Sequence, residues 1–131
     1  MIDKDIIMKD YRVIIAGGRD FADYPLLEET CNDMLMEKRQ SHHVIIVSGH
    51  ASGADALGER YAHENGLDLE AHPADWNKHG KTAGPIRNAE MAAVADALIA
   101  FWDGKSRGTA DMISKARAKG LRVVVVSYEQ A

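Results

Sequence analysis

The sequence contains a single cysteine, Cys31, among its 131 residues. One cysteine cannot form a disulfide within the chain. Because Cys31 lies inside a helical pattern of apolar residues, we expect it to be a small buried hydrophobe rather than a nucleophile. A chain without disulfides is typical of a reducing compartment, so we expect a cytoplasmic protein.

Long apolar runs and an excess of positive charge are also missing. The longest apolar stretches, Ala97–Trp102 and Val123–Val126, are far shorter than the roughly 20 residues of a membrane-spanning helix, and residues 1–10 do not resemble a signal peptide. Sixteen Lys and Arg against twenty Asp and Glu give a formal net charge of -4, without the general attraction to a polyanion that marks nucleic-acid-binding proteins. We therefore expect no membrane association, and nucleic acid is the least favoured partner.

Short β-branched runs alternate along the chain with stretches whose apolar residues lie three and four positions apart. This alternation predicts an α/β fold, and the length suits one domain over residues 11–131 after an N-terminal arm over residues 1–10. Most of the runs are almost wholly apolar, as buried parallel strands are, so we expect helices on both faces of a mostly parallel sheet. The predicted strands are Tyr11–Ala16, His43–Ser48, Asp68–His72, Asp96–Phe101 and Leu121–Ser127.

Helix boundaries are marked by residues that cap or end helices. Asp23 is a candidate N-cap for the first helix, and Gly66 ends the second. The third helix opens at Pro85, and the fourth runs from about Thr109 to Lys119. The stretch Pro73–Gly84 has no periodicity, and a loop of that length in a compact domain is more often functional than idle.

Three glycine-bearing turns follow predicted strands, namely Gly17–Phe21, Ser48–Asp55 and Trp102–Thr109. The carboxyl ends of parallel strands meet at one edge of the sheet, where open α/β folds bind ligands. Glycines let the backbone approach a ligand, and the N–H groups at the start of the following helix bind phosphate or carboxylate. Each turn alone is explained equally well by tight chain reversal, but together they favour an anion site.

Named phosphate and metal motifs fit poorly. Gly104-Lys105-Ser106 resembles the end of a P-loop, but Ile99 stands where that motif needs a glycine, and no Gly-x-Gly-x-x-Gly follows the first strand. The six histidines have no metal-ligand spacing, so we predict no metal site of the protein's own. A Mg²⁺ ion accompanying a bound phosphate stays open, because Asp20, Asp55, Asp75 and Asp103 lie near predicted strand ends.

Arg87 is predicted to lie in the first turn of the third helix, where a cation is mildly unfavourable unless an anion sits beside it. A solvated surface arginine is the alternative. Trp76 and Trp102 are candidates for stacking on a planar ring, although most tryptophans fill cores and interfaces. Ala89, Ala92 and Ala93 on the same helix offer either a homodimer face or close packing on the sheet.

These motifs together resemble the SLOG superfamily of Rossmann-like ligand-binding domains, in particular its small stand-alone YspA- or YpsA-related members. The resemblance covers about residues 11–126 and implies a Rossmann-like three-layer sandwich with strand order 3-2-1-4-5. It also implies binding of nucleotides or nucleotide-derived molecules across the glycine-rich loops. The segments on which the resemblance rests are Ile14–Phe21, Val47–Asp55, Trp76 with Arg87-Asn88, and Ala100–Gly104 with Gly108-Thr109.

A more distant resemblance is to the lonely-guy phosphoribohydrolases, which release a base from a nucleoside monophosphate. The spacing of Arg87, Met91 and Ala95 matches that branch, so the resemblance assigns Arg87 to the phosphate or ribose side of a nucleotide. The catalytic glutamate of that branch is replaced by Met112, and a thioether is neither an acid nor a base. The neighbouring Asp111 would point about 100° away on a helix.

Two hypotheses follow. In the first, the protein is a sensor or carrier that binds a nucleotide-like molecule without breaking a bond. In the second, it hydrolyses or transfers an N-glycosidic or phosphoester bond, with Asp20, Asp55 or Asp103 as weak candidates for the general acid or base. The expected ligand-binding residues are Gly17, Gly18, Arg19, Asp20, Ser48, Gly49, Gly53, Asp55, Trp76, Lys81, Arg87, Asn88, Trp102, Asp103, Gly104, Ser106, Gly108 and Thr109.

Overall fold

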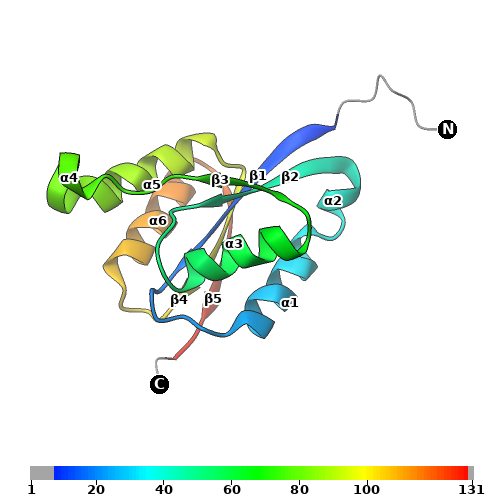
Figure 1. Ribbon diagram of the computed structural model, residues 1–131, viewed down its shortest axis with the longest axis horizontal. Coiled ribbons are helices and arrows are strands. Elements are labelled where there is room, and N and C mark those ends of the chain that lie inside the picture. Colours follow the sequence, from blue (N-terminus) through cyan, green and yellow to red (C-terminus); the bar gives the residue numbers. More distant parts are fainter. Residues whose placement is uncertain (1–7, 130–131) are drawn as a thin grey trace.

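A computed structural model describes residues 8–129 of the chain, and within them five strands form one parallel sheet (Figure 1). The strand order is β3-β2-β1-β4-β5, and every neighbouring pair is parallel. The predicted order and the Rossmann-like α/β class are therefore confirmed. The strands are β1 (Lys9–Gly17), β2 (His42–Ser48), β3 (Asp68–Ala71), β4 (Ala97–Trp102) and β5 (Arg122–Ser127).

Helices cover both faces of the sheet. They are α1 (Tyr24–Leu35), α2 (Lys38–Ser41), α3 (Ala54–Glu64), α4 (Trp76–His79), α5 (Ala83–Val94) and α6 (Arg107–Ala118), with a short 3-10 helix, η1 (Gly80–Thr82), between α4 and α5. Residues of α1 and α3 pack on one face of the sheet, and residues of α5 and α6 pack on the other. Together with the sheet, these helices make the predicted three layers.

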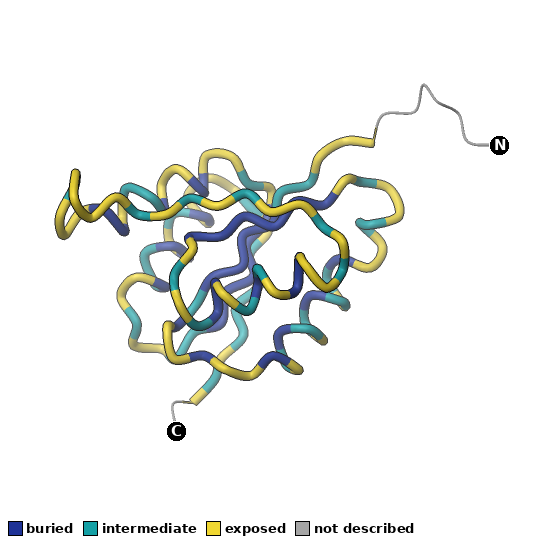
Figure 2. Tube along the Cα trace, viewed as in Figure 1, coloured by how far each residue is buried: buried dark blue, intermediate teal, exposed yellow. Residues whose placement is uncertain are grey.

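The core follows from side-chain alternation along the central strands. Val13 and Ile15 of β1 point to the α1 and α3 face, whereas Ile14 points to the α5 and α6 face, and all three are fully buried. The buried segments accordingly run through the middle of the molecule (Figure 2). Cys31 lies in the first of these two core layers, and burial raises the pKa of its thiol to about 12, as expected for a packing residue.

The predicted cap residues behave as expected. Asp23 precedes α1, and its carboxylate accepts the N–H of Leu26 at 3.1 Å. Gly66 and Gly120 follow α3 and α6 with φ of +65° and +75°, the left-handed conformation that glycine tolerates best.

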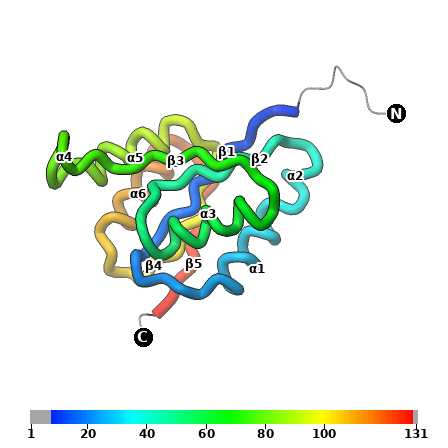
Figure 3. The backbone as a smooth tube through the Cα atoms, in the orientation of Figure 1, coloured from blue at the N-terminus to red at the C-terminus, as the bar shows by residue number. Residues whose placement is uncertain are grey.

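The stretch Pro73–Gly84 is not a structureless loop, so this part of the sequence prediction is wrong. It contains α4 and η1, which lead directly into α5. The Asp75 carboxylate caps α4 by accepting the Lys78 N–H at 3.0 Å. A single helical turn is too short to show hydrophobic periodicity, which is why the pattern did not predict it. Figure 3 shows this segment projecting at the end of the molecule beyond α5.

The start of α5 also differs from the prediction. The helix begins at Ala83 rather than at Pro85, so Arg87 is its fifth residue and lies in the second turn. Pro85 still falls within the first turn, where its missing N–H leaves no intrahelical acceptor unsatisfied. The position of Arg87 must therefore be explained by its contacts rather than by the first turn of the helix.

Two further predictions concern the ends of the chain and self-association. Residues 1–7 of the predicted arm lie outside the described residues, while Lys9 and Asp10 form the start of β1. Ala92 is 3% exposed and packs in the core, so it contributes nothing to a dimer face; Ala89 and Ala93 are exposed. A homodimer stays a prediction.

Candidate functional site

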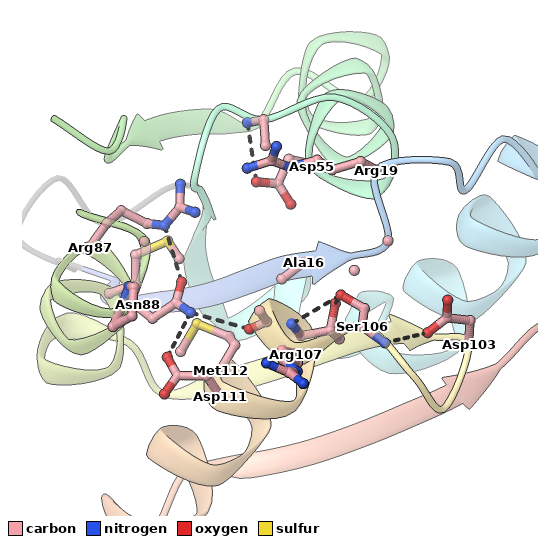
Figure 4. Close-up of a pocket in the computed structure, with 18 of the residues that line it drawn as sticks. Ala16, Arg19, Asp55, Arg87, Asn88, Asp103, Ser106, Arg107, Asp111 and Met112 are labelled. Atoms are coloured by element: carbon pink, nitrogen blue, oxygen red, sulfur yellow. Dashed lines mark hydrogen bonds between the residues drawn. The ribbon is translucent and has the colours of Figure 1, made fainter. Parts of the chain in front are cut away.

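A cavity of about 880 Å³ opens at the carboxyl ends of β1 and β4, between α5 and the start of α6 (Figure 4). This is the sheet edge at which the sequence predicted an anion site. The cavity brings together most of the expected residues, namely Gly17, Gly18, Arg19, Asp20, Asp55, Trp76, Arg87, Asn88, Asp103, Ser106, Gly108 and Thr109.

Six expected residues do not line this cavity. Gly49 borders a smaller neighbouring hollow. Ser48 is fully buried and donates a hydrogen bond to Glu59, and Gly53 packs behind the backbone of Gly18 and Arg19. Lys81 is exposed on η1, and Gly104 lies in open space in a turn. Trp102 donates its indole N–H to the Ser106 carbonyl at 3.0 Å and packs against the core.

Arg87 is held in place by two hydrogen bonds. Its Nη1 donates to the Gly49 carbonyl at 2.5 Å, and its Nε donates to Asn88 Oδ1 at 3.0 Å. Asn88 is itself buried and donates from Nδ2 to the Gly108 carbonyl at 3.3 Å and to Asp111 Oδ2 at 3.0 Å. The side chain of Asn88 thus joins α5 to α6 and fixes the guanidinium against the cavity wall.

The glycine at position 49 makes room for this arginine. A Cβ added at Gly49 would lie 2.4 Å from Arg87 Nη1 and 2.8 Å from Asp55 Oδ2. Any larger residue would therefore displace the guanidinium or the carboxylate. Gly49 supports the site by allowing close approach of side chains rather than by donating to a ligand in the cavity.

Three guanidinium groups, those of Arg19, Arg87 and Arg107, line the cavity. Burial is the main cause of a lowered pKa for Arg87; the Asp55 carboxylate opposes this effect, and the positive charge of Arg19 adds to it. Among the described residues, the side chains of Arg19 and Arg107 make no hydrogen bond or ion pair, and Arg87 Nη2 has no acceptor. These unused donors all belong to residues that line the cavity.

The carboxylates that line the cavity, by contrast, already accept hydrogen bonds. Tyr128 donates its hydroxyl to Asp20 at 2.6 Å. Asp103 accepts the N–H groups of Lys105 and Ser106, and these two bonds are the main cause of its lowered pKa. Asp111 accepts from Asn88 and from Lys115. These three carboxylates therefore hold loops and helices in place.

Asp55 differs from the other cavity carboxylates because it is almost fully buried. Its Oδ2 accepts the Ala51 N–H at 3.2 Å, and its residue exposure is 6%. Burial raises the pKa of Asp55, while the hydrogen bond from Ala51 and the charge of Arg87 oppose that rise. Because burial favours its protonated form, Asp55 is the candidate for a general acid among the cavity carboxylates.

The start of α6 offers the backbone donors of the site. The Ser106 hydroxyl caps the helix by accepting the Thr109 N–H at 3.4 Å. The N–H groups of Arg107 and Gly108, the first two residues of α6, have no acceptor among the described residues. Unpaired N–H groups at a helix N-terminus favour an anion.

Not every N–H group of the glycine turns is free for a ligand. The Gly18 N–H donates to the Phe101 carbonyl at 3.1 Å, and the Gly18 carbonyl accepts the N–H of Ala54. These bonds pack the turn after β1 against β4 and α3. The N–H of Gly108, by contrast, lies at the start of α6 and has no acceptor among the described residues.

Several lining residues are not among the expected ligand-binding residues, although the sequence offered Met91 either as an apolar wall beside Arg87 or as a core residue. Met91 and Met112 are each 1% exposed and, with Ala16, form an apolar wall. Lys105 and Arg107 flank Ser106 and add positive charge at the start of α6. A helix beginning at residue 107 rather than 109 would have placed both beside an N-terminus, so the misjudged helix start concealed them.

Residues 8–129 contain neither a cluster of metal-ligating side chains nor a helix that could span a membrane. No group of three His, Cys, Asp or Glu side chains is arranged to hold a metal ion in this part of the chain. No helix in the same range is both long enough and apolar enough to cross a membrane. The expectation of Mg²⁺ together with a phosphate stays a prediction.

Comparison with known proteins gives a family match and a close relative. Residues 11–79 match the family described as the YspA, cpYpsA-related SLOG family. The Gene 61 protein of Mycobacterium phage D29 is 37% identical over 119 residues, which cover 86% of this chain and 94% of that protein.

Two solved structures share the fold. DNA processing protein A (DprA) from Streptococcus pneumoniae superposes with a TM-score of 0.70 at 16% identity, over 92% of this chain and 51% of that chain. The chain described here therefore spans about half the length of DprA. The protein TM1055 superposes with a TM-score of 0.61 at 21% identity, over 88% of this chain and 72% of that one.

Proposed function

Because the chain belongs to the YspA- and cpYpsA-related SLOG family, we propose that it binds a nucleotide or nucleotide-derived small molecule in the cavity beside Arg87. The observation that carries this proposal is the pairing of unused guanidinium donors with the unpaired N–H groups of α6 in one cavity. A phosphate would satisfy both sets and would relieve the repulsion between Arg19 and Arg87. The protein acts as a sensor or carrier, and the ligand leaves intact.

The cavity also suits the uncharged part of a nucleotide. Met91, Met112 and Ala16 supply an apolar wall, and Trp76 is 50% exposed at the rim. Methionine sulfur and the indole ring both pack well against aromatic rings. We assign the base to this wall and rim, and the phosphate to the side formed by Arg87 and the start of α6.

Hydrolysis of an N-glycosidic or phosphoester bond is the second candidate. Among Asp20, Asp55 and Asp103, the burial and raised pKa of Asp55 favour it as the acid. Met112 stands where the phosphoribohydrolases have their catalytic glutamate, and it is buried. A thioether is neither an acid nor a base, so it does not support hydrolysis by their mechanism. A DNA-associated role like that in the name of DprA ranks last, because the chain is acidic.

Binding is tested by thermal shift with AMP, ADP, NAD⁺ and cyclic AMP, followed by calorimetry of any compound that stabilises the protein. A ligand at 100 times its dissociation constant adds about 2.7 kcal/mol to the free energy of unfolding. We expect Arg87→Ala to weaken binding by about ten- to a hundredfold, since it removes charge-assisted hydrogen bonds. Chromatography of the bound compound should recover it intact, with or without Mg²⁺.

Arg117→Ala is the matched control, because Arg117 is exposed on α6 and does not line the cavity. It should bind as tightly as the wild type. Equal binding by Arg87→Ala, or stabilisation by none of the four compounds, contradicts the proposal. Free base or ribose phosphate formed by the wild type but not by Asp55→Asn would instead establish the hydrolytic function.

A further inference from the structure

A second hollow, of about 360 Å³, adjoins the main cavity at Arg19 and Arg87. It is bordered by the turn after β2 and by the segment that leads into α4, and Arg19, Ala51, Trp76 and Arg87 line both this hollow and the main cavity. The side chain that distinguishes the smaller hollow is His50.

The backbone of His50 is in an unusual conformation. Its φ is +60°, and among residues 8–129 it is the only non-glycine residue with a positive φ. Such a conformation is unfavourable for a side chain larger than hydrogen, and residues held this way cluster at functional sites. A glycine would satisfy the turn without strain, so the imidazole itself needs an explanation.

A buried serine holds the backbone of His50, and a glutamate holds its ring. Ser48 Oγ accepts the His50 N–H at 3.0 Å and donates to Glu59 Oε2 at 2.7 Å. Glu59 Oε2 in turn lies 2.9 Å from His50 Nδ1, while the His50 side chain as a whole is 61% exposed. Because the carboxylate engages Nδ1, the proton there is held and Nε2 is the ring atom left for a ligand.

The charges around the imidazole favour its cationic form. Glu59 and Asp55, both on α3, act to raise the pKa of His50, with the hydrogen bond to Glu59 as the largest cause. The other charged side chains that line the hollow are Arg19, from the turn after β1, and Arg87, from α5. A protonated His50 therefore gives the hollow three cationic groups around one small space.

We propose that this hollow is a second anion subsite, in which His50 Nε2–H, Arg19 and Arg87 bind a second phosphate of the ligand. The inference rests on the proposed function for the ligand's identity, but the anion site can be tested without it. Since Arg19 and Arg87 border both spaces, one phosphate in the main cavity and a second in the hollow would share them. The ligand class is a nucleotide carrying two linked phosphates, and its affinity falls as His50 loses its proton.

Sulfate is the probe, because it mimics phosphate and keeps its two negative charges from mildly acidic to neutral pH. NMR of the His50 ring nitrogens in the full-length protein should show Nε2 shifting on addition of sulfate. Sulfate should raise the pKa of His50 by about one unit, which corresponds to tenfold tighter binding to the protonated ring. As pH rises from the His50 pKa of the free protein through that of the sulfate-bound protein, the affinity should therefore fall by about tenfold in total and then level off.

His50→Gly tests the assignment without straining the turn, because glycine adopts a φ of +60° readily. It should remove the pH dependence and weaken sulfate binding about tenfold below the wild-type His50 pKa. Glu59→Gln should move the midpoint of the pH dependence downward. The inference is overturned if the Nε2 resonance does not shift on addition of sulfate. It is also overturned if His50→Gly binds sulfate as tightly as the wild type at every pH.

The experiments distinguish failure of one proposal from failure of the other. If AMP or another nucleotide binds while sulfate leaves the His50 pKa unchanged, nucleotide binding in the main cavity is supported and the second anion subsite is wrong. If sulfate raises the His50 pKa while no nucleotide binds, the hollow is an anion site and the proposed nucleotide function is wrong.

Discussion

Arg87 and Asp55 have opposite charges and lie near each other, yet burial opposes the charged form of both. Burial lowers the pKa of the arginine and raises that of the carboxyl group, and in each case it outweighs the attraction between them. A pair placed for stability alone would be better solvated or more fully hydrogen-bonded. Burial of these two charges therefore opposes folding, as is common where a site is built to receive a ligand.

Asp55→Asn should make the protein more stable at neutral pH. A raised pKa means that the folded state holds the Asp55 proton more tightly than the unfolded chain does. Wild-type stability therefore falls as pH rises from the ordinary aspartate pKa of about 3.8 up to the folded-state pKa of Asp55. Asparagine retains an oxygen for the Ala51 N–H but cannot ionise, so the variant lacks this loss.

Urea denaturation at several pH values between mildly acidic and neutral measures the effect. The difference in unfolding free energy between Asp55→Asn and wild type should grow with pH and then level off. Asp33→Asn is the control, because Asp33 is an exposed carboxylate on α1. A variant less stable than wild type at neutral pH would mean that the attraction to Arg87 outweighs burial.

At the scale of elements, the sequence was sufficient where periodicity extended over several turns or a whole strand. All five strands and the helices α1, α3, α5 and α6 lie where the apolar spacing predicted them, within a few residues. The helix starts were less well predicted, because the first residues of α5 and α6 carry polar or small side chains. That error placed Arg87 in the first turn of α5 and not in the second, and it left Lys105 and Arg107 inside the predicted ligand turn but away from the helix N-terminus.

The candidate site was predictable to the extent that it depends on strand ends. Because the sheet is parallel, Gly17, Asp55 and Gly108 meet at one edge, although they are far apart in sequence. Side-chain partners were not predictable. Nothing in the sequence showed that Tyr128 engages Asp20 or that Ser106 holds the Trp102 indole. These contacts decide which residues remain available to a ligand.

Close packing of α3 on β1 makes a further prediction at this scale. A Cβ added at Gly58 would lie 2.8 Å from both Cβ and Cγ2 of Ile15. Gly58→Ala should therefore lower the free energy of unfolding by about 1–3 kcal/mol, because overpacking outweighs the better helix propensity of alanine. Denaturant unfolding checks the value.

Gly108→Ala is the matched variant in α6, since a Cβ there meets nothing within 4 Å. It should keep or raise stability, as expected for a helical glycine in open space. If the two variants have equal stability, the contact between α3 and β1 has more freedom to adjust than its geometry indicates.

At the scale of the whole molecule, charge is balanced rather than concentrated. Four cationic residues line the main cavity, namely Arg19, Arg87, Lys105 and Arg107, and so do four carboxylates, namely Asp20, Asp55, Asp103 and Asp111. The chain as a whole has a net charge of -4. Such a surface attracts a small anion through directed hydrogen bonds rather than through a long-range field.

Nucleic acid should therefore not bind appreciably. Fluorescence polarisation of a labelled single-stranded oligonucleotide should stay unchanged as protein is added at about 0.15 M salt, where the field of distant charges is screened within about 8 Å. As the control, binding of a nucleotide identified by thermal shift is measured in the same buffer, which shows that the cavity still binds its ligand. If the oligonucleotide binds and its affinity falls steeply with salt, phosphate backbones are being neutralised along an extended surface. Balanced charge in the cavity would then be irrelevant to partner choice, and the small-molecule proposal would lose its main support at this scale.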